Sequence, residues 1–267
     1  MMISLTRRAA VGVAAALVVT SSVLDVPVRA VAGSKAWIGR YDEFEAFLKS
    51  APFERFDDVD VGVTRPRHGF FTPGGLAAGA TVKRLNPGRN RGFYESYKSE
   101  IAAYKLDRLL HLDMVPPTVE RRVDGDLVSV QLWVENVRTI GEVQRVKDHA
   151  PNVQAWNRQV YRQRVFDDLV ANIDENAGNM LIDPAWNIIK VDHSRCFAES
   201  KMPFELTRID RPLYARLQEI DEATLQREIG DWVERGQIEA LLDRRNEIVK
   251  KFKDLIARQG EPRVLLP

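Results

Sequence analysis

The chain has little of what several common kinds of site require. It contains one cysteine, Cys196, which excludes an intrachain disulfide and a zinc site built on cysteines. Its four histidines are scattered without the spacing of metal ligands, so we expect no structural metal. An excess of charge of one sign is also lacking. The formal net charge of +1 gives no electrostatic reason to expect a nucleic-acid partner.

Long apolar runs are missing too, and the short run that exists lies at the N-terminus. It spans residues 9–20, follows Arg7 and Arg8, and precedes a small-x-small cleavage site at 30–32. It is shorter than the roughly 20 residues that cross a bilayer. Residues 1–32 therefore predict an export signal, similar to a twin-arginine signal, and a periplasmic or extracellular protein without a stable transmembrane segment. An uncleaved signal that anchors the protein in a membrane is the alternative.

The part of the chain up to residue 137 is predicted to be rich in β-strands. Its strands show alternating or β-branched patterns, and the turns between them contain Pro-Gly-Gly and Asp-Gly. We expect these strands at 59–64, 70–72, 78–85, 118–123 and 127–134. Apolar residues at helical spacing predict two helices, at 41–50 and 93–110.

After residue 137 the patterns are mostly helical. A polar loop at 174–179 interrupts them and leads into a hairpin whose second strand ends at Val191. Helices are expected at 156–171, 213–220, 223–233 and 238–259. This change of pattern predicts an α+β protein with a β-rich N-terminal lobe (33–137) and a helical C-terminal lobe (138–267).

The polar loop and the hairpin set three oxygen-bearing side chains near one another. A divalent cation on ATP phosphates prefers hard oxygen ligands and leaves positions for phosphate and water, which Asn179 and Asp192 would suit. Asp174, not used by the metal, could receive the proton of an attacking hydroxyl. An Asx-rich structural turn is the alternative. A calcium-binding loop is disfavoured because Gly178 and Asn179 do not fit its pattern.

Upstream, Lys83 and Glu100 form a candidate pair for phosphate chemistry. Glu100 lies near the apolar stripe of the predicted helix 93–110, where a carboxylate needs a cation. Lys83, on the preceding strand, is a natural partner. Phosphoryl transfer uses an amine that contacts the phosphates and a glutamate that holds the amine. The alternative is that Glu100 lies at the edge of the stripe, in solvent.

Taken in order, these motifs resemble atypical kinases with the phosphatidylinositol-kinase-like fold. That group includes HipA-like bacterial kinases and the secretory-pathway kinases related to four-jointed. Residues 174–179 are similar to the catalytic loop of the group, and residues 191–197 are similar to its metal-binding segment. The other similar segments are the nucleotide-covering hairpin at 61–64, the lysine strand at 80–83, the glutamate helix at 95–112 and the hinge strand at 130–135.

The resemblance implies a two-lobed protein-kinase-like fold that binds ATP and Mg²⁺, or Mn²⁺, between its lobes. It implies phosphoryl transfer to a hydroxyl acceptor (protein, lipid or sugar) that the sequence does not identify. The implied roles are ATP binding by Lys83, Glu100 and Glu135, catalysis by Asp174, and metal binding by Asn179 and Asp192.

One residue departs from the pattern, because Glu175 stands where the group commonly has arginine. Two adjacent acids beside a triphosphate need a compensating cation, for which Arg195 and Lys190 are candidates. An exported nucleotide-binding pseudokinase or interaction module without turnover is therefore the alternative function, and nucleotidyl transfer is a third.

Three further features have simpler interpretations. Cys196 is expected to be a buried packing residue, and His193 a hydrogen-bonded loop residue. The basic loop at 87–92 could contact phosphates or an acidic substrate, but a solvated loop is the simpler interpretation.

Overall fold

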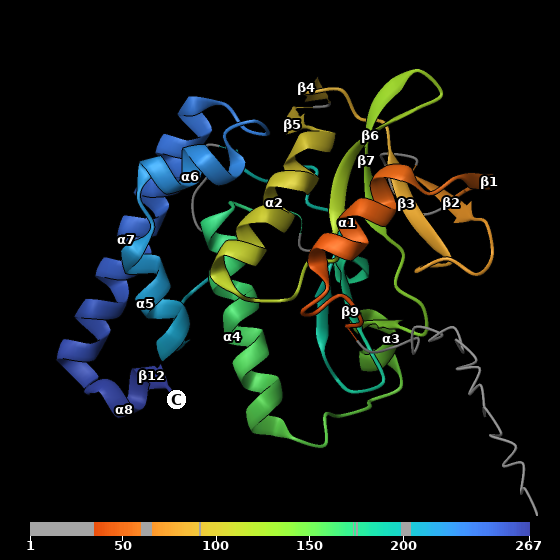
Figure 1. The fold of residues 1–267 in the computed structure, drawn as a ribbon. Coiled ribbons are helices and arrows are strands. Elements are labelled where there is room, and N and C mark those ends of the chain that lie inside the picture. The colour runs from red at the N-terminus through yellow and green to blue at the C-terminus, as the bar shows by residue number, and fades with distance from the viewer. Residues whose placement is uncertain (1–34, 60–65, 91, 173, 175, 199–203) are drawn as a thin grey trace, which may run out of the picture.

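A five-stranded antiparallel sheet and a mostly helical half make up the computed structural model, which describes residues 35–59, 66–90, 92–172, 174, 176–198 and 204–267 (Figure 1). The strands of the sheet lie in the order β1-β2-β3-β7-β6. Their bounds are β1 Phe53–Asp58, β2 Arg67–Phe71, β3 Gly79–Lys83, β6 Thr118–Val123 and β7 Asp126–Leu132.

The two faces of this sheet have different neighbours. Helix α1 (Tyr41–Ser50) covers one face, where Ala80 and Val82 of β3 are buried in a core with residues of α1 such as Phe44. Since successive side chains of a strand point to opposite faces, Lys83 faces away from α1. The alternation along β3 therefore sends one set of side chains into a core and the other set toward the candidate site.

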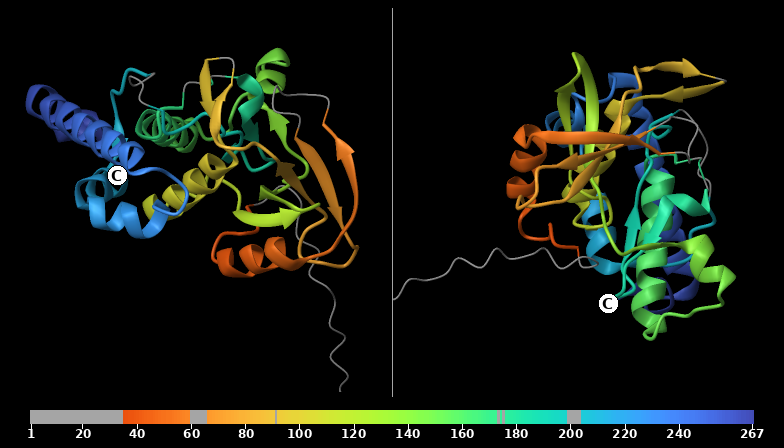
Figure 2. Two further views of the ribbon diagram at one scale, coloured as in Figure 1. Left: turned by 90° about the horizontal axis from the view of Figure 1, so that it is seen from above. Right: turned by 90° about the vertical axis from the view of Figure 1, so that its right-hand side faces the viewer.

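Helix α2 (Tyr97–Leu110) lies between the sheet and the C-terminal helices. It follows a small hairpin of β4 (Gly88–Asn90) and β5 (Phe93–Glu95), and the Ser96 hydroxyl caps its N-terminus by accepting from Lys98 N. The helix contacts β6 and β7 on one side and α5 and α6 on the other, as Figure 2 shows from above. The predicted helix over 93–110 therefore begins four residues too early, because Phe93–Glu95 pairs with β4 as a strand.

The C-terminal half is built on helices around a second core. Apolar residues of α2, α4, α5, α6 and α7 form this core. Its longer helices are α4 Val153–Leu169, α5 Arg211–Glu219, α6 Glu222–Ile229 and α7 Arg235–Gln259. The short elements are β8 Arg138–Thr139, α3 Ile140–Arg145, the 3₁₀ turn η1 Ala177–Asn179, β9 Met180–Ile182, β10 Ile188–Lys190, β11 Ile209–Asp210, α8 Glu261–Val264 and β12 Leu265–Leu266.

The observed elements differ from the predicted ones in a few places. Strand β1 was not predicted, and the strand predicted at 59–64 falls almost wholly on 60–65, outside the described residues. Strands β8, β11 and β12 were also missed, because two-residue strands leave no alternation to detect. The division at residue 137 stays a prediction, since α2 precedes it in sequence yet contributes to the second core.

Among the described residues, no helix combines the length and the apolarity needed to cross a bilayer. The predicted export signal at 1–32 lies outside the described residues.

Candidate active site

Lys83 connects three separate parts of the chain. Its Nζ lies 2.5 Å from Glu100 Oε1, in the first turn of α2, and 2.7 Å from Asp192 Oδ1, after β10. The side chains of Lys83 and Glu100 are almost fully buried, whereas that of Asp192 is about a quarter exposed. The structure thus brings together three residues that the sequence analysis had selected separately, and Glu100 does not lie in solvent.

Lys83 and Asp192 stabilise each other's charged form, whereas Asp192 disfavours the charged form of Glu100. Burial alone lowers the pKa of Lys83, but the carboxylates of Glu100 and Asp192 outweigh it and raise that pKa above its usual value. Burial likewise opposes ionisation of Asp192, yet the Lys83 ammonium outweighs it and lowers the pKa of Asp192. Burial raises the pKa of Glu100, opposed by Lys83 and by the backbone N–H of His193, which donates to Glu100 Oε2 at 3.0 Å. Lys83 and Asp192 are therefore both charged at neutral pH.

The β9–β10 hairpin places Asn179 beside Asp192. Val191 N donates to Asn179 O at 3.0 Å, which continues the ladder to the base of the hairpin. Asp192 itself has a φ of 61°, which Asp tolerates better than most residues, and it accepts a hydrogen bond from Ser194 Oγ. The buried Nδ2 of Asn179 has no hydrogen-bond partner among the described residues. Two oxygen-bearing side chains and an unsatisfied amide at one spot fit a site that a metal–phosphate ligand completes.

Asp174 lies in a run of Asx turns. Its backbone N–H donates to Asn172 Oδ1, its Oδ1 accepts from Asn176 N, and Asn176 Oδ1 accepts from Gly178 N. The structural turn considered as an alternative for this loop is thus present. It leaves the other carboxylate oxygen of Asp174 facing Arg195, whose Nη1 is 3.9 Å away. The turn chemistry and a catalytic role of Asp174 are compatible.

Within the described part of the chain, Arg195 rather than Lys190 lies near Asp174. The Arg195 guanidinium also binds Glu95 through Nε at 2.7 Å and Nη2 at 2.6 Å. Lys190 Nζ instead pairs with the buried Asp167 at 3.1 Å. The prediction that Lys190 compensates the negative charge of the loop at 174–179 is therefore wrong. Glu175, the residue that called for a cation, lies outside the described residues.

The structure does not join Glu135 to the cluster. It is exposed after the end of β7, and no hydrogen bond or ion pair of its side chain occurs among the described residues. The sequence analysis missed a nearby feature, the stacking of His68 on Trp133 with ring centroids 3.8 Å apart. His68 pairs with Thr81 of β3, so it shares the Lys83 face of the sheet. Cross-strand pairing was the signal that could have located it.

His193 and Cys196 are both fully buried beside the cluster. The His193 ring packs edge-on against Phe166, and neither of its nitrogens has a hydrogen-bond partner in the described part of the chain, which corrects the expectation of a hydrogen-bonded ring. Burial lowers the pKa of His193 to about 3, so the ring is neutral. Burial also raises the pKa of the Cys196 thiol, as expected of a packing residue.

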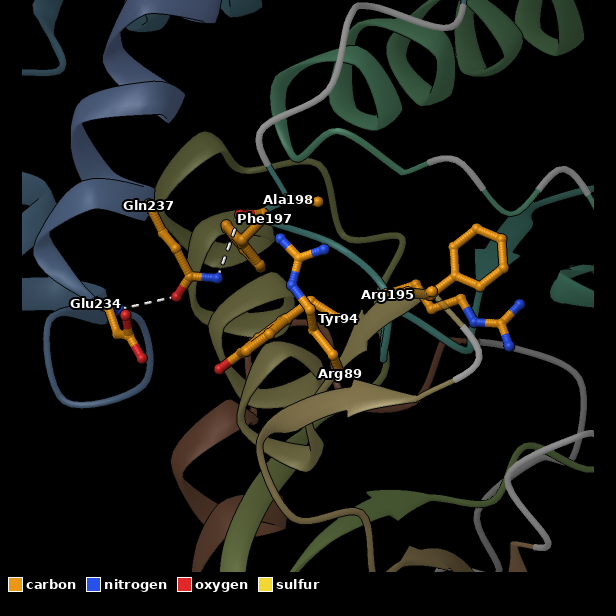
Figure 3. A pocket seen from close by; sticks show the side chains of 9 residues that line it. Arg89, Tyr94, Arg195, Phe197, Ala198, Glu234 and Gln237 are labelled. Carbon is orange, nitrogen blue, oxygen red and sulfur yellow. Dashed lines mark hydrogen bonds between the residues drawn. The ribbon is translucent and has the colours of Figure 1, made fainter.

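A cavity of about 410 Å³ lies beside the segment that follows Asp192 (Figure 3). The β4–β5 hairpin, the segment after Asp192 and the start of α7 form its walls. Its lining residues are Arg89, Gly92, Phe93, Tyr94, Arg195, Phe197, Ala198, Glu234 and Gln237. Arg195 belongs to this lining, and its Nη1 also lies 3.9 Å from Oδ2 of the candidate catalytic residue Asp174.

Comparison with known proteins identifies the fold. No family model matches the chain, and no curated protein matches it in sequence. Among solved structures, the Golgi casein kinase with Mn/ADP bound has 14% identity and a TM-score of 0.64, and the match covers 85% of this chain and 78% of that one. Hydra Fam20 with sugar has the same identity and TM-score, covering 85% and 92%. The Helicobacter pylori proinflammatory kinase CtkA has 13% identity and a TM-score of 0.52, covering 80% and 98%.

At these identities the comparisons establish the fold alone. The chain has a kinase-like α+β fold of the kind seen in these atypical kinases, which confirms the fold class predicted from the sequence. The roles of the individual site residues stay predictions.

Proposed function

We propose that this protein binds ATP with a divalent metal between the sheet and the helical half, and transfers the γ-phosphoryl group to a hydroxyl acceptor. The observation that carries the proposal is the double contact of Lys83 Nζ, with Glu100 at 2.5 Å and Asp192 at 2.7 Å. In protein kinases, a strand lysine paired with a helix glutamate and an aspartate on the metal must both be in place, and Lys83, Glu100 and Asp192 would supply these groups.

The proposed ligand contacts follow from the positions of the side chains. Lys83 would neutralise phosphate oxygens, with Glu100 holding its ammonium in place. Asn179 and Asp192 would each give an oxygen ligand to Mg²⁺ or Mn²⁺, with further positions filled by phosphate and water. The Mn/ADP of the Golgi casein kinase structure supports a nucleotide and a divalent metal in this fold. The segment after β7, which includes Glu135, would serve as the hinge that binds adenine through its backbone.

Asp174 would act on the acceptor. When bound, the metal supplies charge neutralisation for the phosphates, while Asp174 accepts the proton of the attacking hydroxyl. Arg195 Nη1 lies 3.9 Å from Asp174 Oδ2, close enough to attract the carboxylate electrostatically. We further propose that residues 33–137 and 138–267 act as the two lobes, and that the predicted signal at 1–32 exports the protein, with a membrane-anchored form as the alternative.

A nucleotide-binding protein without turnover is the second candidate. Glu175 favours it, because this residue places a second acid beside Asp174 where related loops commonly carry arginine. The two candidates share the nucleotide and differ in the transfer step.

Thermal unfolding with millimolar ATP and either Mg²⁺ or Mn²⁺ tests the shared part. Ligand at about 100 times its Kd stabilises the native state by about 2.7 kcal/mol, which gives a measurable rise in Tm. No rise with either metal would refute nucleotide binding.

Phosphate release or autophosphorylation in the wild type, Asp174→Ala and Asp192→Ala then separates the candidates. Turnover in the wild type alone supports the kinase, and its absence from all three supports the second candidate. Equal turnover in all three would contradict the site assignment.

A further inference from the structure

The cavity shares one wall residue with the surroundings of Asp174. Arg195 lines the cavity, and its Nη1 lies 3.9 Å from Asp174 Oδ2, which makes the cavity a candidate acceptor site. Its volume of about 410 Å³ falls within the roughly 300–1,000 Å³ of small-molecule sites. The Lys83 cluster does not line the cavity, which leaves the proposed phosphate site separate from it.

Arg89 is the charged group that distinguishes this cavity. It pairs with Tyr94 across the β4–β5 hairpin, so both side chains lie on one face of that hairpin. Figure 3 shows its guanidinium projecting among Tyr94, Phe197 and Gln237. No hydrogen bond or ion pair of the Arg89 side chain occurs within the described residues, and its guanidinium carries five N–H donors.

The other polar groups of the lining already have partners or lie apart. Arg195 is neutralised by Glu95. Gln237 donates through Nε2 to Phe197 O and accepts through Oε1 from Glu234 N, so it is held at both ends. The Glu234 side chain lies on the far side of Gln237 from Arg89 (Figure 3). Among the described lining residues, Arg89 is thus the cation available to a ligand, and a guanidinium binds carboxylate and phosphate bidentately.

The remaining lining is aromatic. Phe93 is 41% exposed, and the Arg195 guanidinium lies 4.7 Å from the centre of its ring. Together with Tyr94 and Phe197 it gives the cavity apolar walls near the Arg89 guanidinium. Such a combination orients a small molecule that has a carbon skeleton and one anionic end.

We propose that the acceptor is a small hydroxyl compound carrying a carboxylate or a phosphate, which binds Arg89 while its hydroxyl faces Asp174. This inference rests on the proposed function. In the transfer, the acceptor oxygen forms a bond to the γ-phosphorus of ATP and its proton passes to Asp174. The bond from the γ-phosphorus to the bridging oxygen breaks, and ADP leaves with that electron pair.

Two matched series of probes test the proposal. Glycerol is compared with glycerate and glycerol 3-phosphate, and glucose with glucuronate and glucose 6-phosphate. Binding to the full chain is measured by ligand-observed NMR, with and without a non-hydrolysable ATP analogue, and phosphate incorporation from ATP is measured in parallel. At least one anionic probe is expected to bind about tenfold more tightly than its neutral counterpart, as one charge-assisted pair allows. The carboxylate and phosphate arms distinguish the two anions.

Variants locate the effect. Arg89→Ala is expected to abolish the anion preference and Arg89→Lys to retain part of it, because lysine keeps the charge but not the fork. Arg235→Ala is the matched control, since Arg235 is exposed at the start of α7, pairs with Glu239 and does not line the cavity. It is expected to leave the preference unchanged. The Tm shift with ATP and metal should be the same in all variants.

Failure of this proposal is distinguishable from failure of the proposed function. If none of the anionic probes binds at tens of millimolar, or if Arg89→Ala keeps the preference, the acceptor assignment is overturned even where ATP binds. If ATP does not bind, the proposed function fails. An anion preference that depends on Arg89 would then establish the cavity as an anion site without a transfer role, which also overturns the acceptor assignment.

Discussion

Replacing Lys83 with methionine should make the protein markedly less stable, because it removes the cation from between two carboxylates. The side chain of Glu100 is 2% exposed, and it would lose the partner that lies 2.5 Å away. Removing one member of a buried ion pair costs about 3–5 kcal/mol, largely from the charge left behind. We therefore expect Lys83→Met to lower the free energy of unfolding by about 3 kcal/mol or more at pH 7.5.

A double-mutant cycle with Glu100→Gln separates this cost from lost packing. Glu100→Gln removes the charge that Lys83→Met leaves unpaired, so the double variant should be less destabilised than the sum of the single variants by about 1–3 kcal/mol. The cost of Lys83→Met should also shrink between pH 7.5 and pH 5. Burial already raises the pKa of Glu100, and without Lys83 the carboxyl takes up a proton more readily in the folded state than in the unfolded state.

Urea unfolding followed by circular dichroism measures all four members of the cycle. Lys250→Met is the control, because Lys250 pairs with Asp254 at the surface and should cost less than about 1 kcal/mol. If the two single effects add to within about 0.5 kcal/mol, Lys83 and Glu100 are not coupled and the description of the cluster is wrong.

Three other measurements examine the surroundings of the site. Burial raises the pKa of Asp168 to about 6, above its unfolded value, so the folded state takes up a proton first as pH falls. Lowering the pH from 7.5 to 4.5 should therefore raise the free energy of unfolding of the wild type relative to that of Asp168→Asn. The expected change is on the order of 1 kcal/mol after allowance for solvent screening. If urea unfolding shows the same pH dependence for both proteins, this explanation is wrong. The buried Cys196 thiol should react with a thiol reagent at pH 8 only in urea, and rapid labelling of the native protein would refute its burial. Arg244 donates hydrogen bonds to Leu169 O and Ala198 O. Arg244→Met should therefore lower the free energy of unfolding by about 1–3 kcal/mol and speed amide hydrogen exchange near Ala198. Unchanged stability and exchange would show that these hydrogen bonds are not needed.

The sequence was most informative where local chemistry and position agree. Glu100 lies on the apolar stripe of a helix, which predicts a cation beside it. The neighbouring strand contains such a cation, Lys83. The Asp-Gly turn at 124–125 identified the β6–β7 hairpin, because a two-residue turn of this type leaves little freedom of register. These inferences needed only the periods of helices and strands and the cost of an unpaired buried charge.

Other features depend on contacts between distant segments. Lys190, the last residue of β10, pairs with Asp167 of α4. No sequence pattern connects that helix residue with the β9–β10 hairpin. The Arg195–Glu95 pair joins residues 100 positions apart. The cavity around Arg89 needs three segments that only the folded chain brings together. No local pattern encodes such neighbours, so the loop at 87–92 looked like an ordinary solvated turn.

The position of α2 has a mechanical consequence. Its residues Tyr104, Leu106 and Leu110 are fully buried with the C-terminal helices, so swinging the helix outward would expose them to water. The same helix is tied to α1 on its other side, where Glu45 accepts from the Tyr104 hydroxyl at 2.9 Å and from Arg108 Nη1 at 2.6 Å. Since α2 is held from both sides, any motion that separates Glu100 from Lys83 has to break contacts of α2 with one half or with the other.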